Sequence, residues 1–201
     1  MQVLPFEDKI IAHRGASLQC PENTMAAFNC AFQNGAKVIE FDVMLTKDAV
    51  PIVIHDENLR RTTNARGKVA NFTFAEIEKL DAGSWFSKKF HGERIPSLAQ
   101  VIEFMLFVDL QANIEIKAQP ENIEATVTAV LSLLNQEWPR NKTLPLISSS
   151  DYKTLSILRD LAPEVQLGIV MDSWRSDWQR DANDLGLTSI HLSKKIANKS
   201  N

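Results

Sequence analysis

Short apolar runs recur along the chain and alternate with longer stretches in which apolar positions are spaced as in a helix. The runs have the length of buried strands, and the stretches between them are long enough for helices that cross back over a sheet. This alternation predicts an α/β protein with a largely parallel sheet. Strands are expected at residues 10–13, 38–44, 51–55, 113–117, 144–148, 166–170 and 188–192.

Signals for helix starts stand between these runs. Asn23-Thr24 can cap a helix that stops at Gly35, and Thr73 with Glu76 forms a capping-box pattern for a helix ending at Gly83. Further helices are expected to begin at Ser97, Pro120, Asp151 and Asp172. The order of these elements is that of repeated strand–helix units.

The connection after the strand expected at 51–55 is longer than one crossover helix requires. Residues 57–93 are therefore expected to form a small insertion over one end of the sheet, where such loops often shape a substrate pocket. No internal repeat, low-complexity tract or linker interrupts the sequence. We expect residues 1–201 to form one domain that contains this insertion.

The composition argues against several classes of function. Hydrophobic residues make up 44% and charged residues 23% of the 201 residues, and the net charge is -3. This charge gives no pull toward nucleic acid or an anionic membrane. No apolar stretch approaches the ~20 residues that span a bilayer, and no basic amphipathic helix indicates stable membrane association. Residues 1–9 lack the basic-then-apolar order of a signal peptide, so a cytoplasmic address is expected.

Polar side chains fall on alternate positions of two expected strands. Residues two apart share a face of a strand, so Glu40 and Asp42 lie together, as do Glu115 and Lys117. Aliphatic residues occupy the positions between them. A closed barrel with its helices outside explains this pattern, because the aliphatic face meets the helices and the polar set gathers inside the mouth.

Three carboxylates in one place repel one another and need compensation. A divalent cation supplies it, and all-oxygen ligation favours Mg²⁺ or Ca²⁺ over Zn²⁺. Together with Arg14 and Lys117, three carboxylates and one such ion leave a net charge of about +1, which complements a phosphodiester. His13 and His55, which end two of the expected strands, could serve as base and acid near neutral pH.

The same residues allow structural interpretations. The carboxylates could form a buried ion network with the two cations instead of holding a metal. Asp56 could orient His55 or merely cap the next turn, and Pro21-Glu22-Asn23-Thr24 is typical of turn-and-cap chemistry. His91 and His191 stand in no comparable motif and are expected to be structural.

Over almost its whole length the sequence resembles the bacterial glycerophosphodiester phosphodiesterases of the cytosolic type, which are related to phosphoinositide phospholipase C-like phosphodiesterases. Each matching segment is short, but their joint order and spacing make the resemblance specific. The segments are His13-Arg14-Gly15, Pro21-Glu22-Asn23-Thr24, Glu40-Phe41-Asp42-Val43, His55-Asp56, Leu59-Arg60-Arg61-Thr62-Thr63, Leu80-Asp81-Ala82-Gly83-Ser84-Trp85-Phe86, Ile95-Pro96-Ser97-Leu98 and Ile114-Glu115-Ile116-Lys117.

The resemblance implies a TIM-barrel hydrolase that cleaves glycerophosphodiesters to glycerol 3-phosphate and an alcohol. It implies the following roles: metal binding by Glu40, Asp42 and Glu115, acid–base catalysis by His13 and His55, and phosphate binding by Arg14 and Lys117. One divalent cation, Mg²⁺ or Ca²⁺, is the implied cofactor. The nucleophile is either a hydroxyl of the glycerol or a water positioned by the metal.

The number of expected strands is smaller than the family pattern requires. A TIM (β/α)8-type barrel runs to ~250 residues, and only seven strands are expected here, so the last helix-strand-helix would be lacking. The open edge would expose unpaired backbone, which a second copy or a partner chain could cover.

Two alternative functions stay open beside hydrolysis of small glycerophosphodiesters. A lysophospholipase D-like enzyme would act on lipid-like diesters with the same site. A truncated, catalytically impaired pseudoenzyme or binding protein would keep the site without a closed barrel.

Overall fold

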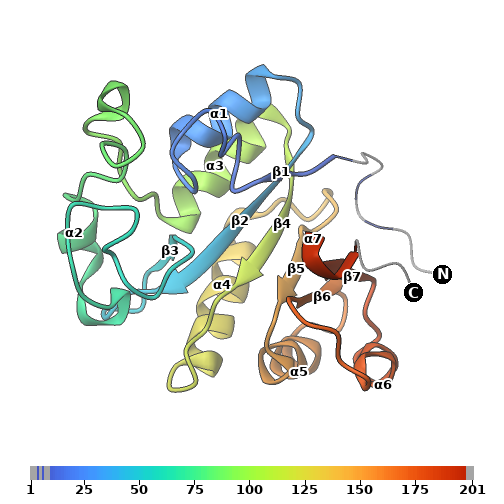
Figure 1. The fold of residues 1–201 in the computed structure, drawn as a ribbon. Coiled ribbons are helices and arrows are strands. Elements are labelled where there is room, and N and C mark those ends of the chain that lie inside the picture. The colour runs from blue at the N-terminus through green and yellow to red at the C-terminus, as the bar shows by residue number, and fades with distance from the viewer. Residues whose placement is uncertain (1–3, 5, 7–9, 198–201) are drawn as a thin grey trace.

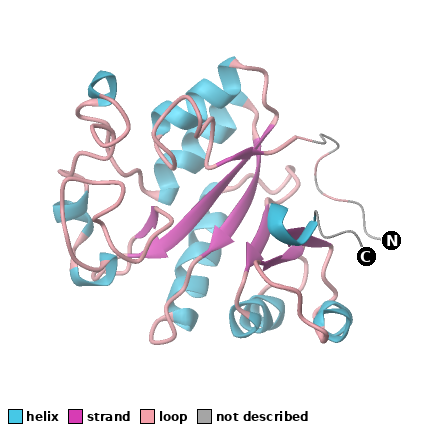
Figure 2. Cartoon of the chain, in the orientation of Figure 1, coloured by secondary structure: helices cyan, strands magenta, loops and turns pink. Residues whose placement is uncertain are grey.

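The polypeptide forms one curled, mainly parallel sheet with helices along its outer side, in a computed structural model that describes residues 4, 6 and 10–197 (Figures 1 and 2). The strands are β1 (Ala12–His13), β2 (Val38–Leu45), β3 (Pro51–Val53), β4 (Gln111–Ile116), β5 (Leu146–Ser149), β6 (Leu167–Met171) and β7 (Ser189–Leu192). The helices are α1 (Met25–Gln33), α2 (Phe74–Ile77), α3 (Leu98–Val108), α4 (Ile123–Glu137), α5 (Tyr152–Leu161), α6 (Trp178–Asp184) and α7 (Lys194–Ala197), with 3₁₀ helices η1 (Val69–Asn71) and η2 (Lys88–Phe90).

The sheet confirms the predicted α/β class and contains a strand in each of the seven expected ranges. Its order is β1-β2-β4-β5-β6-β7, with parallel pairing throughout this path. Helices α3, α4 and α5 pack side by side on the outside, as the crossovers of a TIM-type barrel do. Within the described residues β1 and β7 form the two edges of the sheet.

The prediction that the strand at 51–55 is a regular member of the barrel is wrong. This strand, β3, runs antiparallel to the end of β2 and lies off the parallel path. The reason is the turn before it, in which Thr46 N–H donates to Val50 O at 3.1 Å. So short a connection can join only antiparallel strands, since a parallel pair needs a crossover of a dozen residues or more. The described residues therefore contain six parallel strands in one row.

The two faces of the sheet divide as the alternation predicts. In β2 the apolar side chains point outward, and the ring of Phe41 lies 5.6 Å from that of Phe28 in α1, centroid to centroid. The acidic residues of β2 and β4 face the inside of the curl. The strand register places Asp42 beside Glu115, and Glu115 in turn beside Ser148 of β5.

Helix starts agree with the capping signals in most cases. Thr24 caps α1, Ser97 opens α3 with a complete capping box, and Asp151 caps α5 by accepting from Thr154 N–H at 2.8 Å. Three expected helices differ. The one opened by Thr73 ends at Ile77 rather than Gly83, α4 begins at Ile123 rather than Pro120, and α6 begins at Trp178 rather than after Asp172.

Residues 57–93 pack on a small apolar core of their own beside the end of β2. Leu59, Val69 and Ile77 are buried there with Ile52 of β3. The carboxylate of Asp81 organises the far loop by accepting hydrogen bonds from three backbone N–H groups: Gly83, Ser84 and Gly92. These bonds hold the pKa of Asp81 well below its usual range.

The segment at residues 1–9, in which no signal peptide is expected, lies mostly outside the described residues. Phe6 of this segment is described, and it packs against Val38 and Leu146 at the amino end of the sheet. The polar end at 194–201 is described only as far as residue 197. Among the described residues no helix is long and apolar enough to cross a membrane.

Candidate active site

Three acidic side chains meet inside the curl of the sheet. Glu40 and Asp42 come from β2 and Glu115 from β4, and each offers an oxygen within 4.8 Å of the others. They are 6%, 1% and 6% exposed, respectively. The sequence therefore predicted correctly which carboxylates the fold brings together.

Because the three carboxyl groups are buried close together, it is energetically costly to ionise all of them. Loss of solvent, followed by the nearby charge of Asp42, raises the pKa of Glu40 to about 8. Burial is also the main cause that raises the pKa of Glu115. Glu40 Oε1 is buried and has no hydrogen-bond partner among the described residues. A cluster that offers only oxygen ligands, one of them without a hydrogen-bond partner, suits a hard divalent cation.

Two cationic side chains flank the carboxylates. Lys117 Nζ lies 2.6 Å from Glu115 Oε1 and 3.5 Å from Asp42 Oδ1. Although burial alone would lower it, these two carboxylates raise the pKa of Lys117. Lys117 therefore keeps its charge beside the cluster. Arg14 Nε lies 3.3 Å from Asp42 Oδ2.

The turn after β1 brings Arg14 over the carboxylates in a specific backbone conformation. Arg14 has φ 58°, and its own N–H donates to Glu40 Oε2 at 2.9 Å. Gly15 follows with φ 76°, and a Cβ at that position would lie 2.7 Å from the backbone carbon of Ala27. Only glycine fits this close approach between the turn and α1, which explains the Arg-Gly pair in physical terms.

The two candidate catalytic histidines stand in different settings. His13 Nε2 is 3.8 Å from Glu40 Oε2. Although 67% of the His13 side chain is exposed, partial loss of hydration and the charge of Arg14 lower its pKa. His55 shares a hydrogen bond of 2.6 Å between its Nδ1 and Asp56 Oδ1. Of the two interpretations of Asp56, the geometry matches the one in which it orients His55.

Arg61 of the insertion connects the carboxylate that pairs with His55 to the carboxylate that pairs with Arg14. It donates to Asp56 and also to Glu22, with Nη1 2.7 Å from Glu22 Oε2. Glu22 in turn accepts from Arg14 Nη1 at 2.8 Å. Hydrogen bonds from Arg61 lower the pKa of Asp56 to about 2. In Glu22, hydrogen bonds from Arg61 and Arg14 outweigh the effect of burial and lower the pKa.

Asn23 belongs to this site, although its sequence motif is typical of turns and caps. Its Nδ2 donates to Asp42 Oδ2 at 2.9 Å, and its Oδ1 accepts from Asp42 N–H at 3.3 Å. The motif has both functions, because the neighbouring Thr24 caps α1. The only sequence signal for Asn23, Glu22 and Arg61 was their place in segments that resemble the family.

A cavity of about 490 Å³ opens over the cluster. One wall carries Glu40 and Glu115 with the candidate histidines and cations, and the other is formed by β6, β7 and the start of α7. His191, expected to be structural, lies on that second wall, where burial lowers its pKa and its Nε2 is 2.9 Å from Ser189 Oγ. His91 instead lies in the insertion, with Nδ1 3.5 Å from Asp81 Oδ2.

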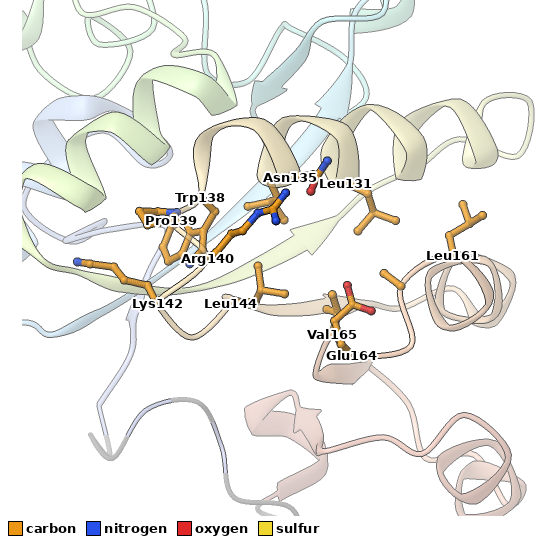
Figure 3. Close-up of a pocket in the computed structure, with 12 residues that line it drawn as sticks. Leu131, Asn135, Trp138, Pro139, Arg140, Lys142, Leu144, Leu161, Glu164 and Val165 are labelled. Atoms are coloured by element: carbon orange, nitrogen blue, oxygen red, sulfur yellow. The ribbon is translucent and has the colours of Figure 1, made fainter.

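Another cavity, of about 400 Å³, lies near the amino ends of β5 and β6, between the ends of α4 and α5 (Figure 3). Leu131, Trp138, Leu161 and Val165 contribute apolar surface to it. None of the carboxylates or histidines described above lines it. In barrels of this kind chemistry occurs at the carboxyl ends of the strands, where the 490 Å³ cavity lies.

The curled parallel sheet carries acidic, basic and imidazole groups at the carboxyl ends of its strands, an arrangement consistent with the TIM-barrel class of fold. A family model described as "Glycerophosphoryl diester phosphodiesterase family" matches residues 13–201. The chain belongs to this family.

Relatives of known sequence and structure agree with the family match. The chain is 44% identical over 165 residues to a glycerophosphodiester phosphodiesterase of Caldanaerobacter subterraneus subsp. tengcongensis, covering 80% of this chain and 65% of the relative. It is 36% identical over 163 residues to a glycerophosphodiester phosphodiesterase of Bacillus altitudinis, covering 81% and 66%. The chain thus spans just under two thirds of the length of these relatives.

Among solved structures, a phosphodiesterase of Oleispira antarctica in complex with the product sn-glycerol-3-phosphate superimposes with a TM-score of 0.88. It is 37% identical, and the match covers 92% of this chain and 74% of that one. A glycerophosphodiester phosphodiesterase of Agrobacterium tumefaciens superimposes with a TM-score of 0.71 at 26% identity. The matched region therefore contains most of a fold that binds glycerol 3-phosphate in the Oleispira protein.

Proposed function

We propose that the protein hydrolyses glycerophosphodiesters to glycerol 3-phosphate and an alcohol in a reaction that depends on one divalent cation. The observation that carries this proposal is the cluster of Glu40, Asp42 and Glu115, with oxygens within 4.8 Å and two cations in contact. Family membership and the product named for the Oleispira structure support the choice of substrate.

Glu40, Asp42 and Glu115 would hold the cation, Mg²⁺ or Ca²⁺, since all three offer carboxylate oxygens. When bound, the cation would polarise a phosphoryl oxygen and neutralise part of the carboxylate charge. Asn23 keeps the Asp42 carboxylate in place by donating to its Oδ2, while Asn23 Oδ1 accepts from the backbone N–H of Asp42. The backbone N–H of Arg14 fixes one oxygen of Glu40 and leaves Oε1 without a protein partner.

Arg14 and Lys117 would bind the phosphate, because both side chains already line the cavity beside the carboxylates. Their charges would stabilise the negative charge on the phosphoryl oxygens in the transition state. His13 and His55 would then transfer protons, one from the nucleophile and one to the departing oxygen. The pairing of His55 Nδ1 with Asp56 would leave its Nε2 as the atom that exchanges a proton.

The nucleophile in this proposal is either the glycerol hydroxyl nearest the phosphorus or a water held in the same cavity. The difference is measurable, because attack by the hydroxyl forms a cyclic phosphate before hydrolysis. Release of a cyclic glycerol phosphate at early times would support the first route. Undiminished hydrolysis of an analogue that lacks this hydroxyl would support the second.

We also propose that residues 1–201 act as one catalytic unit whose open sheet edges, β1 and β7, are covered in the active protein. A second copy or a partner chain could supply this cover, since an unpaired edge readily recruits another strand. Measurement of molecular mass and activity across a dilution series would test it. A fully active monomer would contradict it. The cytoplasmic address stays a prediction, which cell fractionation would test.

The main experiment measures glycerol 3-phosphate release from glycerophosphocholine and glycerophosphoethanolamine, with added Mg²⁺ or Ca²⁺ and with chelator. We expect release that depends on the metal, and a loss of roughly 10²–10⁴-fold in His13→Ala or His55→Ala. His91→Ala is the matched control, because His91 lies outside the cavity.

The same experiment separates the alternative functions. Faster turnover of lysophosphatidylcholine than of glycerophosphocholine would indicate a lysophospholipase D-like enzyme. Binding of metal and glycerol 3-phosphate by folded protein without any turnover would indicate a binding protein. If the folded protein shows no binding and no turnover, the proposal as a whole is contradicted.

A further inference from the structure

The cavity of about 400 Å³ near the amino ends of β5 and β6 has no part in the proposed reaction (Figure 3). Residues 131–144, at the end of α4 and in the loop after it, form one side, and residues 161–165, after α5, form the other. The carboxylate cluster lies at the opposite, carboxyl ends of the strands. A cavity of this volume can hold a small molecule, which would bind here without entering the active site.

Most of the lining of this cavity is apolar and belongs to the packed core. Leu134, Trp138 and Val165 line it and are 3%, 5% and 3% exposed. The indole Nε1 of Trp138 donates to Thr143 O at 3.1 Å, so the rest of the ring offers only apolar surface. Leu161 also lines the cavity, although it is 56% exposed. Such a surface can cover an alkyl chain.

The charged residues of this cavity are divided between its two ends. Arg140 and Lys142 lie towards one end, and Glu164 lies towards the other (Figure 3). Lys142 Nζ already pairs with Asp109 Oδ1 at 2.6 Å. The guanidinium of Arg140 makes no hydrogen bond or ion pair with a described residue. An anionic head group can therefore pair with Arg140, whereas Glu164 would repel an anion at the other end.

The chemistry of the proposed substrate indicates which amphiphilic anion accompanies it. A glycerophosphodiester carries free hydroxyls on its glycerol at the positions where a phospholipid carries acyl esters. Hydrolysis of each ester consumes one water and gives one glycerol hydroxyl, one alkyl carboxylate and one proton. Phospholipid deacylation is thus the class of reaction that supplies the substrate, and it releases fatty-acid anions at the same time.

We propose that this cavity binds an alkyl carboxylate, with the carboxylate at Arg140 and the alkyl chain on the apolar surface of Leu134, Trp138 and Val165. The choice of a fatty-acid anion rests on the proposed function, whereas the cavity and its charges do not depend on it. The site would thus be occupied by the co-product of the reaction that forms the substrate.

Calorimetric titration of the 201-residue chain with hexanoate, octanoate and decanoate, each kept below its micelle-forming concentration, measures the apolar contribution. Each added methylene should lower Kd by roughly 2- to 4-fold while the chain still finds apolar surface. Leu161→Glu places a carboxylate beside the alkyl chain and should raise the Kd of decanoate by about 10-fold. Leu18→Glu is the matched control, because Leu18 is 96% exposed and follows the carboxyl end of β1.

The contribution of charge is measured with 1-octanol and suberate, which keep the chain length of octanoate. Arg140→Gln should raise the Kd of octanoate by roughly 3- to 10-fold and leave that of octanol unchanged. Arg66→Gln, in the insertion, should leave both unchanged. Suberate carries a second carboxylate at its far end and should bind more weakly than octanoate. Glu164→Gln should reduce this difference, because it removes the repelling charge.

The outcomes separate this inference from the proposed function. Folded wild-type protein that hydrolyses glycerophosphodiesters but binds no decanoate would overturn the site and leave the proposed function standing. Equal affinity for decanoate in Leu161→Glu, Leu18→Glu and the wild type would also overturn the site, because binding would then lie elsewhere. Octanol that binds as tightly as octanoate would overturn the anionic class of ligand. Decanoate binding that Leu161→Glu weakens, in a protein without any hydrolysis, would support the site and overturn the proposed function.

Discussion

Arg61 holds Asp56 through two hydrogen bonds, from Nε to Oδ2 at 2.6 Å and from Nη2 to Oδ1 at 2.9 Å. The same guanidinium reaches Glu22, so one side chain of the insertion fixes partners on both sides of the site. Such a planar, bidentate donor positions carboxylates more rigidly than an ammonium group does. The insertion thereby acts on His55 through Asp56.

Replacement of Arg61 should impair catalysis through position rather than contact. Arg61→Gln removes the charge that holds Asp56 and Glu22, and we expect kcat to fall by about 10²-fold with a small change in KM. Arg66→Gln is the matched control, because Arg66 lies in the same segment and makes no ion pair with a described residue. Steady-state kinetics at several pH values would measure the effect. Equal kcat in the two variants would show that Arg61 has no positioning role.

Removal of one of the three carboxylates should abolish the rise in melting temperature that added metal is expected to cause. We expect Mg²⁺ or Ca²⁺ at 100 times Kd to stabilise the wild type by about 2.7 kcal/mol, and a chelator to reverse this. Glu40→Gln should melt at the same temperature with or without metal, since it loses a charged ligand in a cluster whose oxygens lie within 4.8 Å. Glu103→Gln, on α3 outside the cluster, should respond like the wild type. Calorimetry would measure these shifts.

Asp81 should stabilise the insertion in a manner that depends on pH. Its folded-state pKa lies below the unfolded value, so its stabilisation is present at neutral pH and is lost as the pH falls below about 4. Asp81→Asn weakens three hydrogen bonds from backbone N–H groups and should cost about 1–3 kcal/mol at pH 7. Urea unfolding at pH 7 and pH 3 would measure it. A difference between variant and wild type that stays constant down to pH 3 would contradict this account.

Two glycines with positive φ should differ in their tolerance of a methyl group. Gly35 has φ 86° and no atom within 4 Å of the position that a Cβ would take, so Gly35→Ala should cost about 1 kcal/mol from backbone strain alone. At Gly15 the Cβ would also approach Ala27 to 2.7 Å, so Gly15→Ala should cost about 3 kcal/mol. It should also weaken metal binding, because the adjacent Arg14 N–H holds Glu40. Thermal or urea unfolding of both variants would measure the costs, and similar losses would show that the turn can relax.

The sequence predicted the site best where the position of a side chain depends on the geometry of a strand. Glu40 and Asp42 share a face because side chains alternate along any strand, and Glu115 joins them because parallel strands meet at the same edge. The strand at 51–55 was expected to be parallel, although its connection to β2 is too short for a crossover. The turn length was the signal that identified it as antiparallel.

The sequence by itself determined the class of fold, the inward-facing carboxylates and the helix caps, because each depends on local periodicity or on neighbours a few residues apart. Only the tertiary structure decided that Asn23 holds Asp42, that Arg61 joins Asp56 to Glu22, and that His191 faces the cavity. The contacts of Asn23 with Asp42 and of Arg61 with Glu22 join residues 19 and 39 positions apart, and His191 shares the cavity with residues from the other end of the described chain. Such distances follow from how the sheet curls and where the insertion packs, and no periodic pattern encodes them.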